Sequence, residues 1–329
     1  MVLCLFFLVP AGARGAKPAA LVVTVVTRPV KLDFLSSFEV PRGVGSGLIV
    51  SAKKGIILAP SYLVQGAQWI DVILPDGGQL GAKILALDQL TGLALLKTKP
   101  FGKQEVSIRK DLPKAGERVW LVGRPRFRVV LRSTYVCESP VRIISRGITL
   151  GSFFAVEGDL KGLGSAPLFD AKGRALGFAL ALPNLAEGTT VKVVPGYLMA
   201  LVVQKALEEE KIIWPWLGLE GVALTPAVVK ALGLPVSRGL LVTRVYPGSP
   251  AAVVGIRGAR KTSSLGNLLW PSGGDVLVSF NGVPVSSQAD LEKLLFVTAP
   301  GKIVELKIWR GKRLQPVKVY LGRRSFVQP

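Results

Sequence analysis

The stretch "GLGSAPLFDAKGRALGFALAL", residues 162–182, contains the pattern on which the prediction of the fold depends. Two short apolar runs flank the segment "DAKGR", in which Gly173 supplies the positive φ that a hairpin turn requires, so we expect two antiparallel strands here. Before the first strand, Gly162, Gly164 and Ala166 are small residues typical of a tight turn. Ser165 lies within that turn, and its hydroxyl raises the question of nucleophilic chemistry.

The chain on the N-terminal side of this stretch repeats the same organisation. From about residue 20 to residue 194, short runs rich in Val, Ile and Leu alternate with Gly, Pro and Asp, and no long stripe of helical period interrupts them. This spacing predicts a mainly β fold, a barrel or a sandwich. The runs include "LVVTVVTR", "GSGLIVS", "GIILAP", "WIDVILPDGG", "GLALLKT" and "ERVWLVGRP".

The period changes at residues 195–211, "PGYLMALVVQKALEEEK". Leu198, Leu201, Val202, Lys205 and Ala206 fall on one side, and Pro195 suits the first turn of a helix. We therefore expect a helix that closes the first domain. A second pattern starts at Trp216 and predicts a small α+β module of strands, two short helices and a terminal hairpin. Residues 257–273, polar and rich in glycine, are expected to form an exposed loop inserted in that module.

Composition limits the class of protein. The 329 residues are 49% hydrophobic, enough for a sizeable core in two or three globular units. With 42 Lys and Arg against 21 Asp and Glu, the formal net charge is +21, which favours anionic partners.

The N-terminal segment, residues 1–16, has an apolar run, a proline and then small residues, as in a signal peptide. We expect export to the periplasm or another part of the cell envelope, and a retained anchor is the alternative. Cys4 would leave with the signal, so Cys137 would have no partner for a disulfide, and we expect it to be buried as a small hydrophobe.

Taken in order, these stretches resemble the HtrA/Deg family, which joins a trypsin-like double β-barrel to a PDZ domain. The resemblance implies a protease-fold domain over residues 17–214 and a PDZ domain over residues 215–324 with the insertion at 257–273. It implies no cofactor and no metal. The matching stretches are "GVGSGLIVS", "GIILAPSYLV", "VILPDGGQLGAKILALDQLTGLALLK", "LVGRP", "GLGSAPLFDAKGRALGFALAL" and "VVPGYLMALVVQKAL".

The three catalytic positions of that family can be located one by one. The histidine position reads Tyr62, in "APSYLV", and the aspartate position reads Gly92, in "TGLALL". The serine position reads Gly164, one residue before Ser165. The resemblance therefore implies a degenerate triad, that is, a pseudoprotease with no catalytic residue at these positions.

The chain contains no histidine, so no imidazole exists to act as a general base near neutral pH. A phenol with the ordinary pKa of about 10 is protonated at that pH. We therefore interpret Ser165 as a small residue in a turn, with two alternatives left open: a displaced nucleophile with a non-imidazole base, and a Ser-Lys dyad for which Lys161 is the only lysine near in sequence.

A second candidate site is the segment Trp216, Leu217, Gly218 and Leu219, which matches the carboxylate-binding loop of the family's PDZ domains. Such loops present backbone N–H groups to the C-terminus of a peptide that adds as a strand. Leu291 and Leu295, in "QADLEKLLF", would form the facing wall of the groove. The alternatives are that the two leucines of the loop only fill the core, or that the insertion covers the groove.

A third feature is a series of arginines, Arg124, Arg126, Arg128 and Arg132, which would share one face of a strand. An exported chain meets little nucleic acid, so we expect an anionic envelope polymer, a lipid headgroup or an acidic protein as partner instead. A face that only improves solubility is the alternative.

These observations lead to one main hypothesis and two rivals. The main hypothesis is an exported, catalytically inactive HtrA-like protein that binds peptide segments or protein C-termini, as a scaffold, a chaperone or a regulator of another envelope protein or protease. The rivals are a residual serine endopeptidase that uses Ser165 with a non-His base, and a structural component of an envelope assembly. Phe34 and Phe38, before the first barrel strands, suggest a homotrimer or a plug for the chain's own barrel.

Overall fold

The computed structural model describes residues 17–29, 43–145, 148–182, 186–187, 189–209, 211–231, 233–265, 268–311 and 313–324. The expected signal segment at residues 1–16, with Cys4, and the expected trimer residues Phe34 and Phe38 lie outside these ranges. In the part of the chain described, no helix has the length and apolar character needed to cross a membrane.

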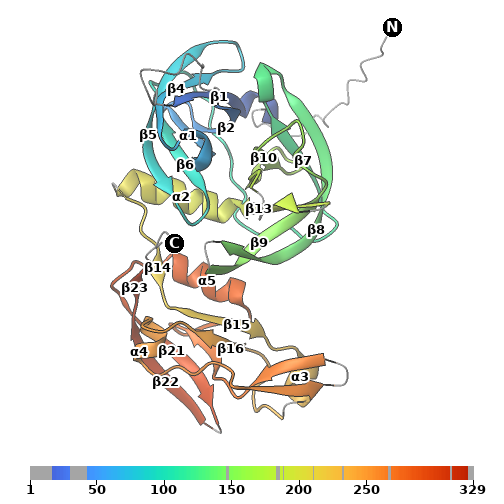
Figure 1. Cartoon of the computed structure of the whole chain (residues 1–329), viewed down its shortest axis with the longest axis vertical. Helices are drawn as coiled ribbons and strands as arrows, with labels where there is room; N and C mark the ends of the chain where they lie inside the picture. Colours follow the sequence, from blue (N-terminus) through green and yellow to red (C-terminus); the bar gives the residue numbers. More distant parts are fainter. Residues whose placement is uncertain are drawn as a thin grey trace, which may run out of the picture. The chain divides into compact units, whose positions relative to one another are not determined.

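The chain divides into two compact units, and each is mainly β, as predicted (Figure 1). The first unit comprises residues 1–139 and 154–212, and the second comprises residues 140–153 and 213–329. Residues 140–153 therefore group with the PDZ-like module, although the predicted division had placed them in the protease-fold domain.

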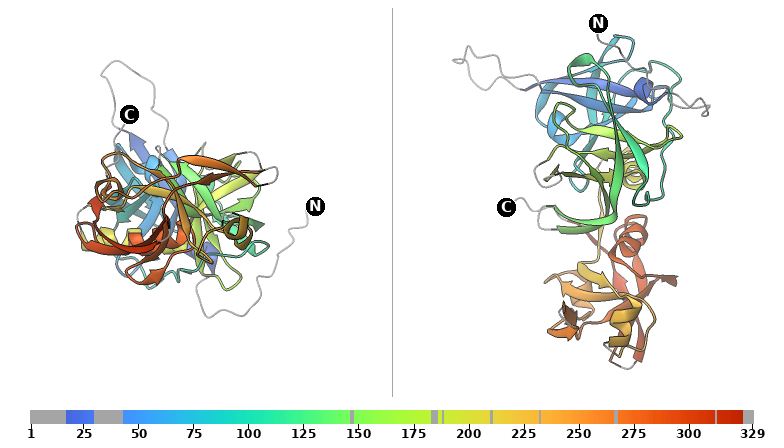
Figure 2. Two further views of the ribbon diagram at one scale, coloured as in Figure 1. Left: turned by 90° about the horizontal axis from the view of Figure 1, so that it is seen from below. Right: turned by 90° about the vertical axis from the view of Figure 1, so that its right-hand side faces the viewer.

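The first unit begins with a closed barrel of six strands in the order β1-β2-β3-β6-β5-β4. Its blue and cyan strands stay together in both views of Figure 2. The barrel closes because β1 pairs with both β2 and β4. The strands are β1 (Val22–Pro29), β2 (Gly43–Ser51), β3 (Ile56–Pro60), β4 (Ala67–Ile73), β5 (Gln79–Asp88) and β6 (Leu93–Lys97), and the short helix α1 (Ser61–Val64) follows β3.

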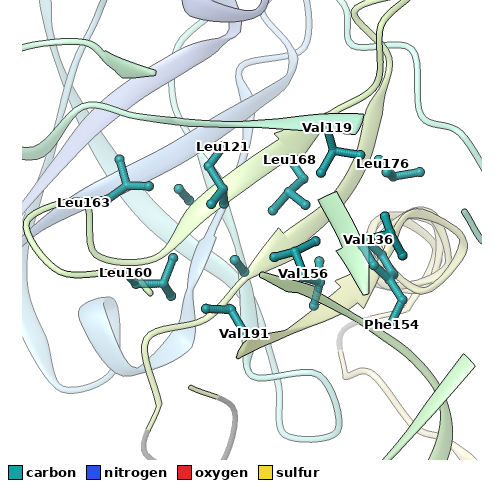
Figure 3. Packing of buried hydrophobic residues seen from close by; sticks show 13 residues of the cluster. Val119, Leu121, Val136, Phe154, Val156, Leu160, Leu163, Leu168, Leu176 and Val191 are labelled. Atoms are coloured by element: carbon teal, nitrogen blue, oxygen red, sulfur yellow. The ribbon is translucent and has the colours of Figure 1, made fainter. Parts of the chain in front are cut away.

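A second ring of six strands follows in the same unit, in the order β11-β10-β7-β8-β9-β13, closed by the pairing of β11 with β13. Its interior is packed with Val, Leu, Ala and Phe side chains, most of them fully buried (Figure 3). The strands are β7 (Arg118–Gly123), β8 (Val130–Ser145), β9 (Ile148–Glu157), β10 (Ala166–Phe169), β11 (Ala175–Ala179) and β13 (Thr190–Pro195), with the two-residue β12 (Ala186–Glu187) at the edge. The predicted hairpin is thus β10 and β11.

The helix predicted at residues 195–211 is α2 (Gly196–Glu208), with Pro195 in the extended conformation just before it. Leu198, Val202 and Ala206 are buried, as the helical period predicted. Cys137 differs from expectation: its side chain is exposed, because the odd-numbered residues from Leu131 to Cys137 lie on the exposed face of β8.

The second unit contains a sheet in the order β15-β16-β19-β21-β22. The strands are β15 (Leu219–Ala223), β16 (Leu240–Val245), β19 (Val276–Phe280), β21 (Ile303–Arg310) and β22 (Arg313–Tyr320), with β20 (Val283–Pro284) beside β19, and β14 (Pro215–Trp216) paired with β23 (Gly322–Arg323). The helices are α3 (Pro226–Ala231), α4 (Pro250–Val253) and α5 (Gln288–Phe296). The turn after β19 has positive φ at Asn281 and Gly282, as an Asn-Gly hairpin turn requires.

The insertion at residues 257–273 is not the irregular loop that its polar composition suggested. It forms a two-stranded hairpin, β17 (Lys261–Leu265) with β18 (Leu268–Ser272). Trp270 anchors this hairpin against an apolar cluster that includes Leu241 and Val276. The apolar residues near the end of the insertion were the signal that it is packed rather than free.

Candidate active site and peptide-binding loop

The residue in the family's histidine position and the candidate nucleophile are brought together. Tyr62 lies in α1, directly after β3, and Ser165 lies immediately before β10. The Tyr62 hydroxyl is 2.8 Å from Ser165 Oγ, a hydrogen bond between residues 103 positions apart in the sequence. Tyr62 is 47% exposed whereas Ser165 is 2% exposed, so the hydrogen bond joins an exposed side chain to a buried one.

A backbone donor fixes the orientation of Ser165. The N–H of Ala181 donates to Ser165 Oγ at 2.7 Å. Because one lone pair of the oxygen accepts that bond, the hydroxyl proton of Ser165 remains available for the Tyr62 oxygen. The arrangement is a pair of hydroxyl groups in hydrogen-bond contact, the geometry that proton transfer from a serine nucleophile needs.

Gly92, in the aspartate position, also lies beside this pair. Its carbonyl accepts a hydrogen bond from the N–H of Ser61, next to Tyr62, at 2.8 Å. Its φ is +73°, and a Cβ at this position would lie 3.1 Å from Leu180 Cδ1. The chain segments that carry Tyr62, Gly92 and Ser165 therefore lie close together. The aspartate position holds a glycine, so no carboxylate is present there to orient a base.

Gly164, in the serine position, has φ of +67° and open space where a Cβ would lie. The N–H groups of Leu163 and Gly164 donate to the carbonyl of Leu160, at 3.1 and 2.9 Å. The tight turn predicted here is therefore present. Because those donors are engaged within the turn, they do not face the space where an oxyanion would form.

Lys161, the base considered for a Ser-Lys dyad, is exposed, and its N–H donates to Asp159. No contact joins it to Ser165 among the residues that the structure describes. Tyr62 is thus the side chain that reaches the serine hydroxyl.

The predicted peptide-binding loop is built around Gly218. This glycine has φ of +78°, and a Cβ here would lie 2.1 Å from Ser249 Cβ. Leu217 and Leu219 are buried, and the carbonyls of Leu217 and Gly218 accept from Ala251 and Tyr246. Within the described ranges, no hydrogen bond from the N–H groups of Leu217 and Gly218 to another group is found, as a carboxylate-binding loop requires.

Trp216, half-buried, borders this loop, and its ring lies 6.5 Å from that of Tyr246. Leu291 and Leu295 of α5 are both buried, at 1% and 4% exposure. Strand β18 of the β17–β18 hairpin packs beside β16. The polar residues of α5, Gln288 and Glu292, were not selected from the sequence, although their spacing of four places them on the same side of the helix.

The four arginines do not share one strand. Pro125–Phe127 form a 3₁₀ helix, so the strand parity assumed for Arg124, Arg126 and Arg128 does not apply there. Arg132 lies on β8 and is paired with Asp159 at 3.2 Å, and it also donates to the carbonyl of Lys161. These arginines therefore do not lie along one strand as the sequence suggested.

The comparisons with known proteins agree with this fold. Residues 45–178 match a trypsin-like peptidase domain and residues 215–321 match a PDZ domain. A solved HtrA-type protease, AlgW with a tripeptide, matches with a TM-score of 0.70 and 23% identity over 93% of this chain and 95% of that one. At this identity, the likeness concerns the fold.

Relatives of the chain are named as proteases. The periplasmic pH-dependent serine endoprotease DegQ of Escherichia coli is 27% identical over 85% of this chain and 59% of its own length. A probable periplasmic serine endoprotease, DegP-like, of Bartonella henselae is 27% identical over 85% of this chain and 53% of its own length. The chain thus spans a little more than half the length of these relatives.

These names contradict the prediction that the chain is not an enzyme and acts only as an inactive scaffold, chaperone or regulator. The prediction treated an imidazole as indispensable. The contact between two hydroxyl groups, one from each barrel, is a feature that the sequence did not reveal and that offers another route to a proton acceptor.

Proposed function

We propose that this chain is a member of the HtrA/Deg family of trypsin-like serine proteases with a PDZ domain, and that it is an exported serine endopeptidase whose nucleophile is Ser165. The observation that carries this proposal is the 2.8 Å hydrogen bond between Tyr62 Oη and Ser165 Oγ. The periplasmic names of the relatives support an envelope location.

The reaction follows the chemistry of acyl transfer. Ser165 Oγ attacks the carbonyl carbon of a peptide bond, and its proton passes to Tyr62 Oη in the phenolate form. The C–N bond then breaks as the departing amine takes that proton. Water hydrolyses the resulting ester, so that one peptide and one water give two shorter peptides and the serine is restored.

Two features of the site limit the rate of this reaction. Ser165 is 2% exposed and hydrogen-bonded to Tyr62, so the surrounding atoms must rearrange before a substrate carbonyl reaches Oγ. The N–H groups of Leu163 and Gly164 must leave Leu160 to stabilise an oxyanion, a stabilisation usually worth about 3–4 kcal/mol. We therefore expect slow turnover.

A fluorophosphonate probe tests the nucleophile directly. The purified chain is incubated with the probe at pH 9.5, digested and analysed by mass spectrometry. We expect a covalent adduct on Ser165 and none in the Ser165→Ala variant. Absence of labelling at Ser165 in the intact chain over hours would reject the proposal.

The PDZ domain supplies a second part of the function. The unengaged N–H groups of Leu217 and Gly218 support binding of a peptide C-terminal carboxylate, with the peptide chain adding along β15. Fluorescence polarisation with labelled decapeptides ending in Val, Leu or Phe measures this binding. The same peptides with an amidated C-terminus are expected to bind at least tenfold more weakly, and equal binding would exclude the carboxylate loop.

A further inference from the structure

The outer edge of β15 is held by a side chain of α5. β15 lies at one edge of its sheet, with β16 as its only neighbour in the strand order, and α5 lies next to β15 (Figure 1). The N–H of Gly221, in β15, donates to Gln288 Oε1 at 3.1 Å. A peptide strand that adds to this edge needs such N–H groups for its own backbone hydrogen bonds.

Gln288 is itself fixed by a buried carboxyl group. Its Nε2 donates to Glu292 Oε1 at 3.1 Å, one helical turn further along α5. Gln288 is 9% exposed and Glu292 is 2% exposed. The amide of Gln288 is therefore held at both ends, by a backbone donor of the sheet edge and by an acceptor of its own helix.

The other partners of Glu292 come from residues 140–153, which belong to the same compact unit. The N–H of Gly151 donates to both carboxyl oxygens of Glu292, at 2.9 and 3.0 Å, and the Ser152 hydroxyl forms a further short hydrogen bond with Glu292. Gly151 and Ser152 are both buried. Breaking hydrogen bonds between buried groups is unfavourable in free energy unless both partners form new hydrogen bonds.

Gly151 also packs closely against the side chain of Gln288. A Cβ at Gly151 would lie 2.9 Å from Gln288 Cγ and 3.0 Å from Gln288 Cβ. Of these two atoms, Cβ is fixed by the helix backbone and cannot move without shifting the helix. Only a glycine allows the backbone of β9 to lie directly on the start of α5.

We propose that Gly151 and Ser152 form an intramolecular latch that keeps the peptide-binding edge of β15 closed. The latch buries the Gln288–Glu292 pair, and this pair in turn occupies the N–H of Gly221. A peptide that adds to β15 must first displace Gln288, and its observed affinity is reduced by the fraction of molecules in which the latch is open. This inference rests on the proposed binding of peptides by the PDZ domain and concerns its regulation.

The test uses a glycine substitution in the full chain with a matched control. Gly151→Val adds bulk against Gln288, whereas Gly81→Val adds the same side chain in β5 of the first barrel, where a Cβ meets nothing within 4 Å. Ser152→Ala removes a hydroxyl without adding bulk and serves as a second variant in case Gly151→Val fails to fold. Amide hydrogen exchange by NMR follows the N–H of Gly221, and fluorescence polarisation follows binding of the labelled decapeptides.

We expect the Gly221 amide to exchange at least tenfold faster in Gly151→Val than in the original chain, and peptide affinity to rise at least tenfold. Gly81→Val should change neither quantity, and Ser152→Ala should change both in the same direction as Gly151→Val. An unchanged amide exchange rate at Gly221 in both Gly151→Val and Ser152→Ala would overturn the latch. This conclusion is independent of the peptide-binding results, because the exchange measurement needs no ligand. Faster exchange with equal peptide affinity would overturn its regulatory role. Faster exchange with no peptide binding in any variant would support the latch and reject the proposed peptide-binding function instead.

Discussion

The hydroxyl of Tyr62 lies 2.8 Å from Ser165 Oγ, across the two barrels of the first unit. If this phenol accepts the serine proton, Tyr62→Phe should lower the rate of fluorophosphonate labelling at least tenfold at pH 9.5. An equal rate of labelling in both proteins would assign Tyr62 a structural role only.

A second prediction concerns the carboxylate loop. Gly218→Ala places a Cβ 2.1 Å from Ser249 Cβ at a φ of +78°, so the loop must move. Gly282→Ala has nearly the same φ, +80°, but its Cβ meets nothing within 4 Å, and it should cost only about 1–2 kcal/mol for the backbone conformation. We expect Gly218→Ala to cost at least ~2 kcal/mol more in urea unfolding followed by tryptophan fluorescence. Equal losses would show that the loop absorbs the methyl group.

The ion pair of Arg310 with Asp275 supports a third prediction. Arg310 donates from Nε and Nη2 to the two carboxylate oxygens of Asp275, at 2.8 and 2.6 Å, and Asp275 is 2% exposed. The carboxylate beside it raises the pKa of the Arg310 guanidinium. Arg310→Ala leaves a buried carboxylate, which should lower the free energy of unfolding by about 3–5 kcal/mol.

The exposed Arg313, near Arg310 in sequence, is the control for that measurement. Arg313→Ala should change the free energy of unfolding by less than about 0.5 kcal/mol. A loss below about 1 kcal/mol for Arg310→Ala would mean that solvent reaches Asp275 once the guanidinium is gone.

A fourth prediction follows from the burial of Glu292. Burial raises the pKa of this carboxyl group above its ordinary value, while hydrogen bonds from Ser152, Gly151 and Gln288 and the charge of Arg324 act in the opposite direction. The pKa of Glu292 is higher in the folded state than in the unfolded chain. The contribution of this group to the free energy of unfolding is therefore at its maximum below about pH 4.5, and it is lost as the pH rises through the folded-state pKa.

The variant Glu292→Gln does not titrate, so its free energy of unfolding should improve relative to the original chain as the pH increases from about 4.5. The slope should be at most ~1.4 kcal/mol per pH unit. Urea unfolding of both proteins between pH 4 and pH 8 measures this slope. A difference that stays constant over the range would indicate that burial does not shift this group.

Much of the fold could be predicted from the sequence because it rests on local patterns. The turn glycine in "DAKGR", the period of the residues in α2 and the Asn-Gly turn at residues 281–282 each determine local structure through neighbouring residues. The loop around Gly218 follows the same logic, since only glycine tolerates its φ beside Ser249. Such features need no knowledge of distant contacts.

The candidate site could be predicted only in part, because its contacts join residues far apart in sequence. The hydrogen bond of Tyr62 with Ser165 depends on how the two barrels approach, and the contact of Gly151 with Glu292 joins residues 141 positions apart. Strand parity misplaced the arginines because Pro125 begins a 3₁₀ turn where a continuous strand was assumed. The sequence shows that the chain has no histidine, but this fact does not identify the side chain that lies beside Ser165 instead.

Hydrolysis of unfolded casein by the purified chain at pH 9.5 tests the central claim, that Ser165 is the nucleophile of an endopeptidase. The cleavage products are measured by mass spectrometry over one day, in parallel with the Ser165→Ala variant prepared in the same way. We predict slow cleavage by the original chain and none by the variant. Equal product formation by the two proteins, or none by either, would contradict this account.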